Sequence, residues 1–229
     1  MKKILTHLCL VGVTALLSHG AAITVADPSF EINSGGDLAS GGWSNDLSPD
    51  WQERDGVNGG STFEEFIPSF VATGTDHVGI AAGSYIWQDT GVALQPNTTY
   101  TLTIATGNRA NQSLSGNLTT YSILAGGMNL GVANYATAAD VIADNTVTLA
   151  TATYDAFTNV PVGTFADAPP LVFSTGDAVP SENVVIFLGA GGAGRSHFDN
   201  VRLDASPIPE VSSSLLSALA GLMLLRRRR

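Results

Sequence analysis

Cysteine is almost absent from this chain of 229 residues, and the single example, Cys9, lies in an apolar stretch near the N terminus. Without a pair of cysteines the protein has no internal disulfide, so its stability must come from core packing or a bound metal ion. No G-x-S-x-G, H-E-x-x-H or P-loop pattern occurs, and only His77 and His197 lie beyond the first 22 residues. The chain thus lacks the usual parts of nucleophilic, zinc and phosphate chemistry, and we predict that it is not an enzyme.

Basic residues are scarce outside the two ends. Between them stand four arginines and no lysine against 20 acidic residues, a net charge of −16. Such a surface makes nucleic acid an unlikely partner, because a phosphate backbone would be repelled. The same acidity suits a secreted protein and supplies oxygen ligands for calcium, although simple solvation explains it equally well.

The N terminus has the pattern of a secretory signal peptide. Lys2 and Lys3 precede an apolar run from Ile4 to Leu17, and small residues follow at 18–22. This pattern predicts export through the Sec pathway, with cleavage before Ala21 or Ile23.

The C terminus carries Pro-Ile-Pro-Glu at 207–210, an apolar run at 211–225 and four arginines at 226–229. As a helix, 15 residues reach roughly 22 Å against a hydrocarbon core of about 30 Å, which is short for a permanent anchor. The segment resembles the PEP-CTERM sorting signal, although Val211 stands where that family usually has a second proline. The matching residues are Pro209, Glu210, Arg226 and Arg227. The resemblance implies a transient stay in the inner membrane, removal by a sorting protease, and a final place in the envelope or outside the cell. An ordinary single-pass anchor is the alternative.

Between the two signals the pattern is all-β, with short apolar segments punctuated by Gly, Ser, Thr, Asn and Asp. In the segment from Thr99 to Asn108, apolar residues alternate with threonines, which is typical of a strand with one buried face. We predict a signal peptide at 1–22, one β-sandwich domain at 23–206, and the sorting signal with its short hydrophobic helix at 207–229. The expected strands are 23–25, 76–81, 85–92, 99–108, 119–125, 128–133, 145–154, 171–174, 184–190 and 197–203. This number of strands favours a jelly-roll β-sandwich over a seven-stranded immunoglobulin-like fold.

Three segments in order carry a second resemblance: Asp-Pro-Ser-Phe-Glu at 27–31, Leu-Gln-Pro-Asn-Thr-Thr-Tyr-Thr-Leu at 94–102, and Phe-Asp-Asn-Val-Arg-Leu at 198–203. Together they are similar to the galactose-binding-like jelly roll of many carbohydrate-binding modules. In that fold the first and last strands are neighbours, and the resemblance implies that Glu31 and Asp199 help to hold a structural calcium ion. The alternative is that these two carboxylates bind backbone amides or pair with Arg202.

Carbohydrate binding in that fold uses exposed aromatic rings with planar polar neighbours. Trp51 lies in a polar stretch and is the expected exposed platform, with Gln52, Arg54 and Asp55 as its hydrogen-bonding neighbours. Trp43 and Trp87 are expected in the core. The predicted function is therefore a non-catalytic exported protein that binds a polysaccharide or exopolysaccharide matrix. A purely structural surface protein and, more weakly, a glycoside hydrolase with paired carboxylates are the alternatives.

Overall fold

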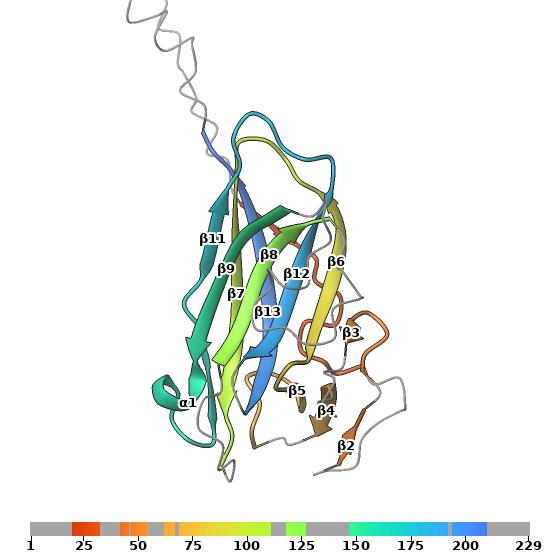
Figure 1. The fold of residues 1–229 in the computed structure, drawn as a ribbon, viewed down its shortest axis with the longest axis vertical. Helices are drawn as coiled ribbons and strands as arrows, with labels where there is room; N and C mark the ends of the chain where they lie inside the picture. The colour runs from red at the N-terminus through yellow and green to blue at the C-terminus, as the bar shows by residue number, and fades with distance from the viewer. Residues whose placement is uncertain are drawn as a thin grey trace, which may run out of the picture.

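The computed structural model describes residues 20–32, 42–45, 47–54, 62–66, 69–110, 118–126, 147–191 and 194–209. Two antiparallel sheets face each other in a jelly-roll-like sandwich, so the all-β prediction is confirmed (Figure 1). The elements are β1 (Ala21–Ile23), β2 (Trp43–Ser44), β3 (Gln52–Arg54), β4 (Thr62–Phe66), β5 (Asp76–Ala81), β6 (Tyr85–Ala93), β7 (Thr98–Asn108), β8 (Leu118–Ala125), β9 (Val147–Asp155), α1 (Ala156–Asn159), β10 (Thr164–Asp167), β11 (Leu171–Ser174), β12 (Asn183–Gly191) and β13 (Arg195–Pro207).

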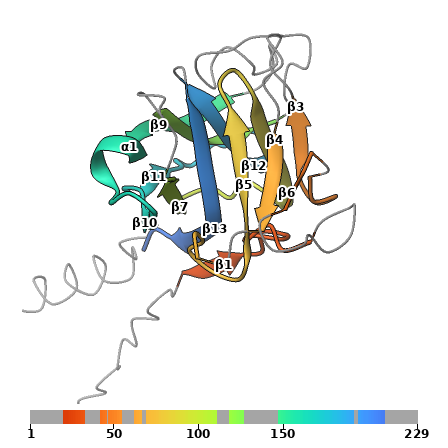
Figure 2. The same ribbon diagram turned by 90° about the horizontal axis from the view of Figure 1, so that it is seen from below.

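The larger sheet has eight strands in the order β10-β7-β13-β5-β4-β2, with β1 added to β13 and β11 to β7. The smaller sheet has five, in the order β3-β6-β12-β8-β9. Figure 1 shows β9, β8, β12 and β6 as one layer with β7 and β13 behind it, and Figure 2 shows β1 beside β13. The last strand thus lies near the middle of its sheet, next to the first.

Strand β7 shows why these residues form this sheet. Tyr100, Leu102 and Ile104 are fully buried in the central core, whereas Thr99, Thr101 and Thr103 between them are half-buried. Because successive side chains of a strand point to opposite faces, this alternation sends every second residue between the sheets. The predicted apolar face and threonine face are both present.

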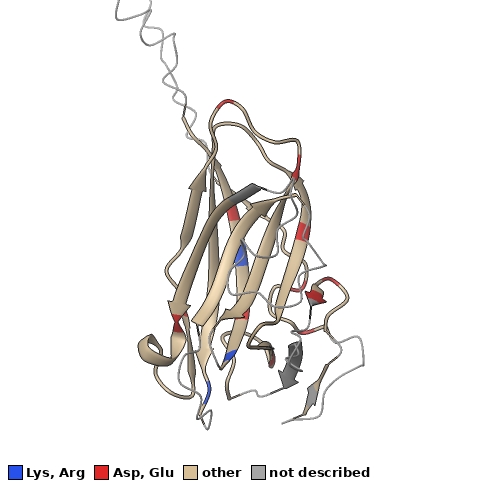
Figure 3. Cartoon of the chain, viewed as in Figure 1, with Lys and Arg blue, Asp and Glu red and all other residues tan. Residues whose placement is uncertain are grey.

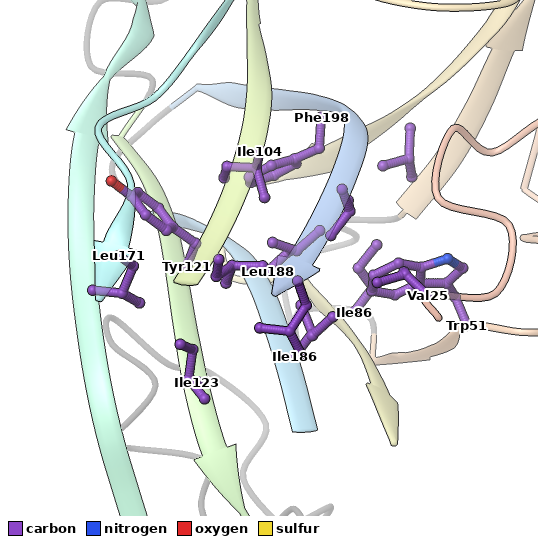
Figure 4. Close-up of a cluster of buried hydrophobic side chains, with 14 of the residues drawn as sticks. Val25, Trp51, Ile86, Ile104, Tyr121, Ile123, Leu171, Ile186, Leu188 and Phe198 are labelled. Carbon is purple, nitrogen blue, oxygen red and sulfur yellow. The ribbon is translucent and has the colours of Figure 1, made fainter. Parts of the chain in front are cut away.

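The central core fills the space between the sheets (Figure 4). Ile86, Ile186 and Ile123 come from neighbouring strands of the smaller sheet, and Ile104 and Phe198 come from the larger one. Their burial is the main stabilising contribution to the domain, at about 1.5–3 kcal/mol for each large apolar side chain.

The expected strands at 76–81 and 171–174 match β5 and β11, and seven others match to within a few residues. The expected strand at 128–133 lies outside the described residues. The sequence did not predict strands β2, β3, β4 and β10 or the four-residue helix α1. Asp155 caps the start of α1, and its carboxylate accepts a hydrogen bond from the Thr158 N–H at 3.1 Å. These unpredicted elements have between two and five residues, which is too few for a periodic pattern to be recognised in the sequence.

The two ends of the domain meet. Ala21 of β1 pairs with Ala205 of β13, and the N–H of Ile208 donates to the Asn97 carbonyl at 2.6 Å. Most of the predicted signal peptide and sorting signal, including Glu210, Arg226 and Arg227, lies outside the described residues; Pro209 is the last one described. Both signals therefore stay predictions. Within the described ranges no helix is long and apolar enough to cross a membrane.

Charged residues lie mostly on loops and near strand ends, and most of the described ribbon carries none (Figure 3). Arg202 pairs with Asp167 at 2.6 Å, with both side chains about half exposed. An exposed pair of this kind contributes at most about 1 kcal/mol to stability. Arg202 is thus engaged by β10, and not by Glu31 or Asp199.

Candidate functional site

A cluster of aromatic rings lies on the outer face of the five-stranded sheet. Along β6, Ile86 belongs to the central core, whereas Tyr85 and Trp87 alternate with it and point to the other face. Along β12, Phe187 likewise stands between core residues Ile186 and Leu188. The three outward-facing rings form what we call the outer aromatic cluster.

The cluster is tightly packed although it is not part of the core. Tyr85, Trp87 and Phe187 are only 1%, 7% and 0% exposed. The ring centroid of Tyr85 lies 5.7 Å from that of Trp87 and 5.5 Å from that of Phe187. Both pairs are tilted, at distances typical of aromatic pairs. Small-molecule sites are lined mainly by hydrophobic and aromatic side chains, so the outer aromatic cluster is a candidate site.

Polar residues of the neighbouring strands border the rings. Phe187 pairs in register with Trp87 on one side and with Ser122 on the other, and Gln52 of β3 stands opposite Trp87 at the sheet edge. Ser122 is buried and donates to the Thr151 hydroxyl at 2.8 Å, whereas Gln52 is exposed. The same register places Arg54 of β3 opposite Tyr85, so a basic residue also belongs to the strand beside the rings.

A second buried cluster lies on the outer face of the eight-stranded sheet. His77 Nε2 and His197 Nδ1 are 3.1 Å apart. The Phe70 ring packs against both imidazoles, with centroids 5.2 Å from His77 and 5.5 Å from His197. The Phe165 ring packs against His77, with centroids 5.5 Å apart. Gly107 stands opposite both His197 and Phe165 in the register. A Cβ atom there would lie 2.6 Å from the Phe165 ring and 2.7 Å from the Phe70 ring, so only glycine leaves room for this packing.

Burial controls ionisation in the second cluster. Burial, followed by the charges of His77, Arg109 and Arg195, lowers the pKa of His197 well below its ordinary value. Burial also raises the pKa of Asp199, although backbone N–H groups from Thr73, Ala72 and Asn200 oppose that shift. His197 is therefore a neutral imidazole at neutral pH.

Acid should destabilise the protein through His197. Because its pKa is depressed in the folded state, the stabilisation is present above about pH 6.5, the ordinary histidine pKa, and is lost as the pH falls from there toward the folded-state pKa. The raised pKa of Asp199 acts in the opposite sense, since folding favours its protonated form at pH values just above the ordinary aspartate pKa. When the pH is lowered from 7.5 to 5.5, we expect the urea concentration at the midpoint of unfolding to decrease. The decrease should be smaller in the His197→Gln variant than in the wild-type protein. An equal fall in both proteins would contradict this assignment.

The prediction that Trp51 is an exposed platform for carbohydrate is wrong. Trp51 is 4% exposed and belongs to the central core, where it packs on Phe30 at 5.2 Å and donates from Nε1 to the Asp27 carbonyl at 3.1 Å (Figure 4). Gln52 is exposed, while the side chain of Arg54 and the whole of Asp55 lie outside the described part. Trp87 is buried as expected, but on the outer face of the sheet. Trp43 lies in β2, and its side chain is outside the described part.

The predicted metal residues do come together. Glu31 and Asp199 both bind the loop between Val71 and Asp76, through backbone N–H groups. Among the described residues, no group of three or more His, Cys, Asp or Glu side chains is arranged to hold a metal ion. The geometry matches the alternative reading, in which these carboxylates bind backbone amides.

The sequence contained one signal for the outer aromatic cluster. Tyr85 and Trp87 alternate with Ile86 and Gln88, so both faces of that strand carry large side chains. Such a strand is covered on both sides, which indicates that something besides the second sheet lies over it. Phe187, about 100 positions away, could not be joined to them without the register of β6 and β12.

Comparisons with known proteins agree on the fold. The family model HpiC1-like, described as HpiC1 cyclase, matches residues 21–204. A cyclase from Fischerella sp. TAU is 19% identical, with a TM-score of 0.62 over 84% of this chain and 100% of that one. The apo form of a Fischerella sp. cyclase is also 19% identical, with a TM-score of 0.61 over 83% and 98%. A structure described as CBM4 is more distant, at 14% identity and a TM-score of 0.47 over 80% and 99%.

No curated protein sequence matches the chain significantly. The family match overturns two predictions, namely that the protein is not an enzyme and that it is a polysaccharide-binding module. The predicted β-sandwich itself is confirmed by the two facing sheets, and one fold can serve unrelated functions. The family model covers the sandwich from β1 to residue 204 of β13, and the chain therefore belongs to the HpiC1-like cyclase family.

Proposed function

We propose that this protein is a cyclase that closes a ring in an apolar, unsaturated substrate at the outer aromatic cluster. Membership of a family described by its cyclase supports the reaction class. The observation that carries the site is the packing of Tyr85, Trp87 and Phe187 on a sheet face that contributes nothing to the central core.

The chemistry of ring closure suits these side chains. Protonation of one double bond creates a carbocation, a second double bond attacks it to form a carbon–carbon bond, and loss of a proton returns a neutral product. The faces of Trp87 and Phe187 stabilise positive charge by cation–π attraction. A site this buried also keeps water away from the cation, which water would otherwise trap as an alcohol.

Tyr85 is the proposed acid of this reaction. Its hydroxyl can both donate and accept a proton, whereas the Trp87 indole N–H only donates a hydrogen bond, and the Tyr85 ring is held beside both other rings. A phenol can donate a proton to the substrate and recover one from the cation.

An assay on the full chain tests the proposal. Acyclic dienes and polyenes, with and without an aromatic ring, are incubated with the protein and analysed by chromatography and mass spectrometry. We expect at least one substrate to give a product of unchanged mass with one carbon–carbon double bond fewer. Hydrated products alone, heavier by one water, would contradict a water-excluding site. No turnover of any substrate would count against the proposed substrate class.

A further inference from the structure

We propose that Glu31 and Asp199 join the beginning and end of the domain as amide-bound carboxylates, in place of the calcium ion that the carbohydrate-binding-module resemblance implies. We call this arrangement the carboxylate clasp. It comprises the two carboxylates and the loop at 72–76 that both of them bind.

Asp199 makes one half of the clasp from the last strand. Its Oδ2 accepts from the N–H groups of Ala72 and Thr73 at 2.6 and 3.0 Å. Its Oδ1 accepts from the N–H of Asn200 at 2.6 Å and, more weakly, from the Thr73 hydroxyl at 3.4 Å. Four donors on one buried carboxylate occupy about all the lone-pair directions that it has.

Glu31 makes the other half from the opening segment. Its Oε1 accepts from the N–H groups of Thr75 and Asp76 at 2.9 and 3.1 Å, and its Oε2 from the Thr75 hydroxyl at 3.0 Å. A Cβ atom at Gly74 would collide with this carboxylate, and Gly74 has a φ of +65°. Both the space and the backbone conformation of the loop therefore fit the bound carboxylate.

The same donors leave the two carboxylates unsuited to a cation. Calcium takes six to eight oxygens at about 2.3–2.6 Å, and these oxygens must be free to turn toward the ion. Here each carboxylate faces N–H and O–H hydrogens, whose partial positive charge would repel a cation. Oε1 of Glu31 and Oδ2 of Asp199 each already accept two N–H bonds.

Further bonds hold the clasp in place. Asp27 accepts from the N–H groups of Glu31 and Ile32 at 2.8 and 3.2 Å, which fixes the turn that presents Glu31. The N–H of Val201 donates to the Pro28 carbonyl at 2.8 Å, so the opening segment also bonds directly to the last strand. Asn200, between Asp199 and Val201, has a φ of +49°, an uncommon conformation that the bonds on both sides of it maintain.

Thermal unfolding of the full chain in calcium and in chelator tests the carboxylate clasp. We expect the same melting temperature in both, and no stoichiometric calcium binding by calorimetry. Asp199→Asn places an amide against N–H donors and should lower the melting temperature by about 5–10 °C, and Glu31→Gln by about 2–5 °C. Asp204→Asn, which changes an exposed carboxylate on the same strand, is the matched control and should change it little.

The outcomes are decisive in either direction. Calcium that raises the melting temperature of the wild-type protein but not of Glu31→Gln would show a cation site and overturn the proposal. If Asp199→Asn does not fold, the comparison of the wild-type protein with Glu31→Gln still decides. These measurements do not depend on turnover, so they stand whether or not the cyclase assay succeeds.

Discussion

Replacing Trp51 with alanine should lower the free energy of unfolding by about 3–5 kcal/mol, the usual cost of truncating a large buried aromatic side chain. The indole is part of the central core, stacks on Phe30, and donates a hydrogen bond to the Asp27 carbonyl. Alanine would leave a cavity and an unsatisfied carbonyl together. Because the whole domain is expected to be stable by only about 5–15 kcal/mol, this is a large fraction of the total.

Urea unfolding followed by far-ultraviolet circular dichroism measures the loss. Gln52→Ala, at the exposed neighbour, is the control and should change the free energy of unfolding by less than about 0.5 kcal/mol. Trp51→Phe keeps a ring but loses the N–H donor, so its loss of unfolding free energy should lie between those of Trp51→Ala and Gln52→Ala. If Trp51→Ala were as stable as Gln52→Ala, the burial of the indole would be contradicted.

Replacing Tyr85 with phenylalanine should lower kcat of the cyclase reaction by about 10²–10⁴-fold, the range by which a positioned proton donor accelerates a reaction. The change removes only the hydroxyl and keeps the ring that packs on Trp87 and Phe187. KM should change little, because the apolar contacts with the substrate remain. Steady-state kinetics with the best substrate from the assay would measure both constants.

Tyr154→Phe is the matched control for this variant. The Tyr154 side chain is half-buried and packs against the central core, so loss of its hydroxyl should leave kcat unchanged. If Tyr85→Phe also retained the wild-type kcat, the proton donor would be another group. A rise in KM at constant kcat would instead assign Tyr85 to substrate binding.

The sequence predicted most of the strands because their alternation is local. In β7 the threonine and apolar faces can be recognised within ten residues, and β5 and β11 were placed at their observed bounds. Strands β2, β3 and β4 have between two and five residues; β2 and β3 lie at sheet edges, and β4 lies between β2 and β5. Their formation depends on a neighbouring strand brought up by the fold, which no local pattern contains.

Trp51 shows how a polar neighbourhood misleads. Asp50, Gln52 and Glu53 surround it in the sequence and are exposed, yet its own side chain turns into the core. The backbone N–H of Trp51 donates to the Ser48 carbonyl at 3.0 Å. This bond closes a turn that reverses the direction of the chain. Gln88 then fastens this segment to β6 by donating to the Asp50 carbonyl at 3.1 Å. The burial of one residue in a loop is thus decided by contacts distant in the sequence.

The prediction that the protein is not an enzyme failed for a related reason. It rested on the absence of short motifs that carry a nucleophile, a zinc site or a phosphate loop. A cyclase that works with aromatic rings needs none of these, and its proposed residues are ordinary strand residues from β6 and β12. Such a site has no signature of spacing, because two strands that are far apart in the sequence supply it.

The sequence by itself determined the all-β class, because alternation and turn residues are properties of consecutive positions. The approach of Glu31 and Asp199 was implied only by the resemblance of the ordered motifs to a known fold, in which the first and last strands are neighbours. Only the tertiary structure decided that Trp51 is a core residue, that the two carboxylates bind amide groups, and that Tyr85, Trp87 and Phe187 share one face. Each of these depends on register between strands, and a shift of one residue would send the same side chains to the opposite face.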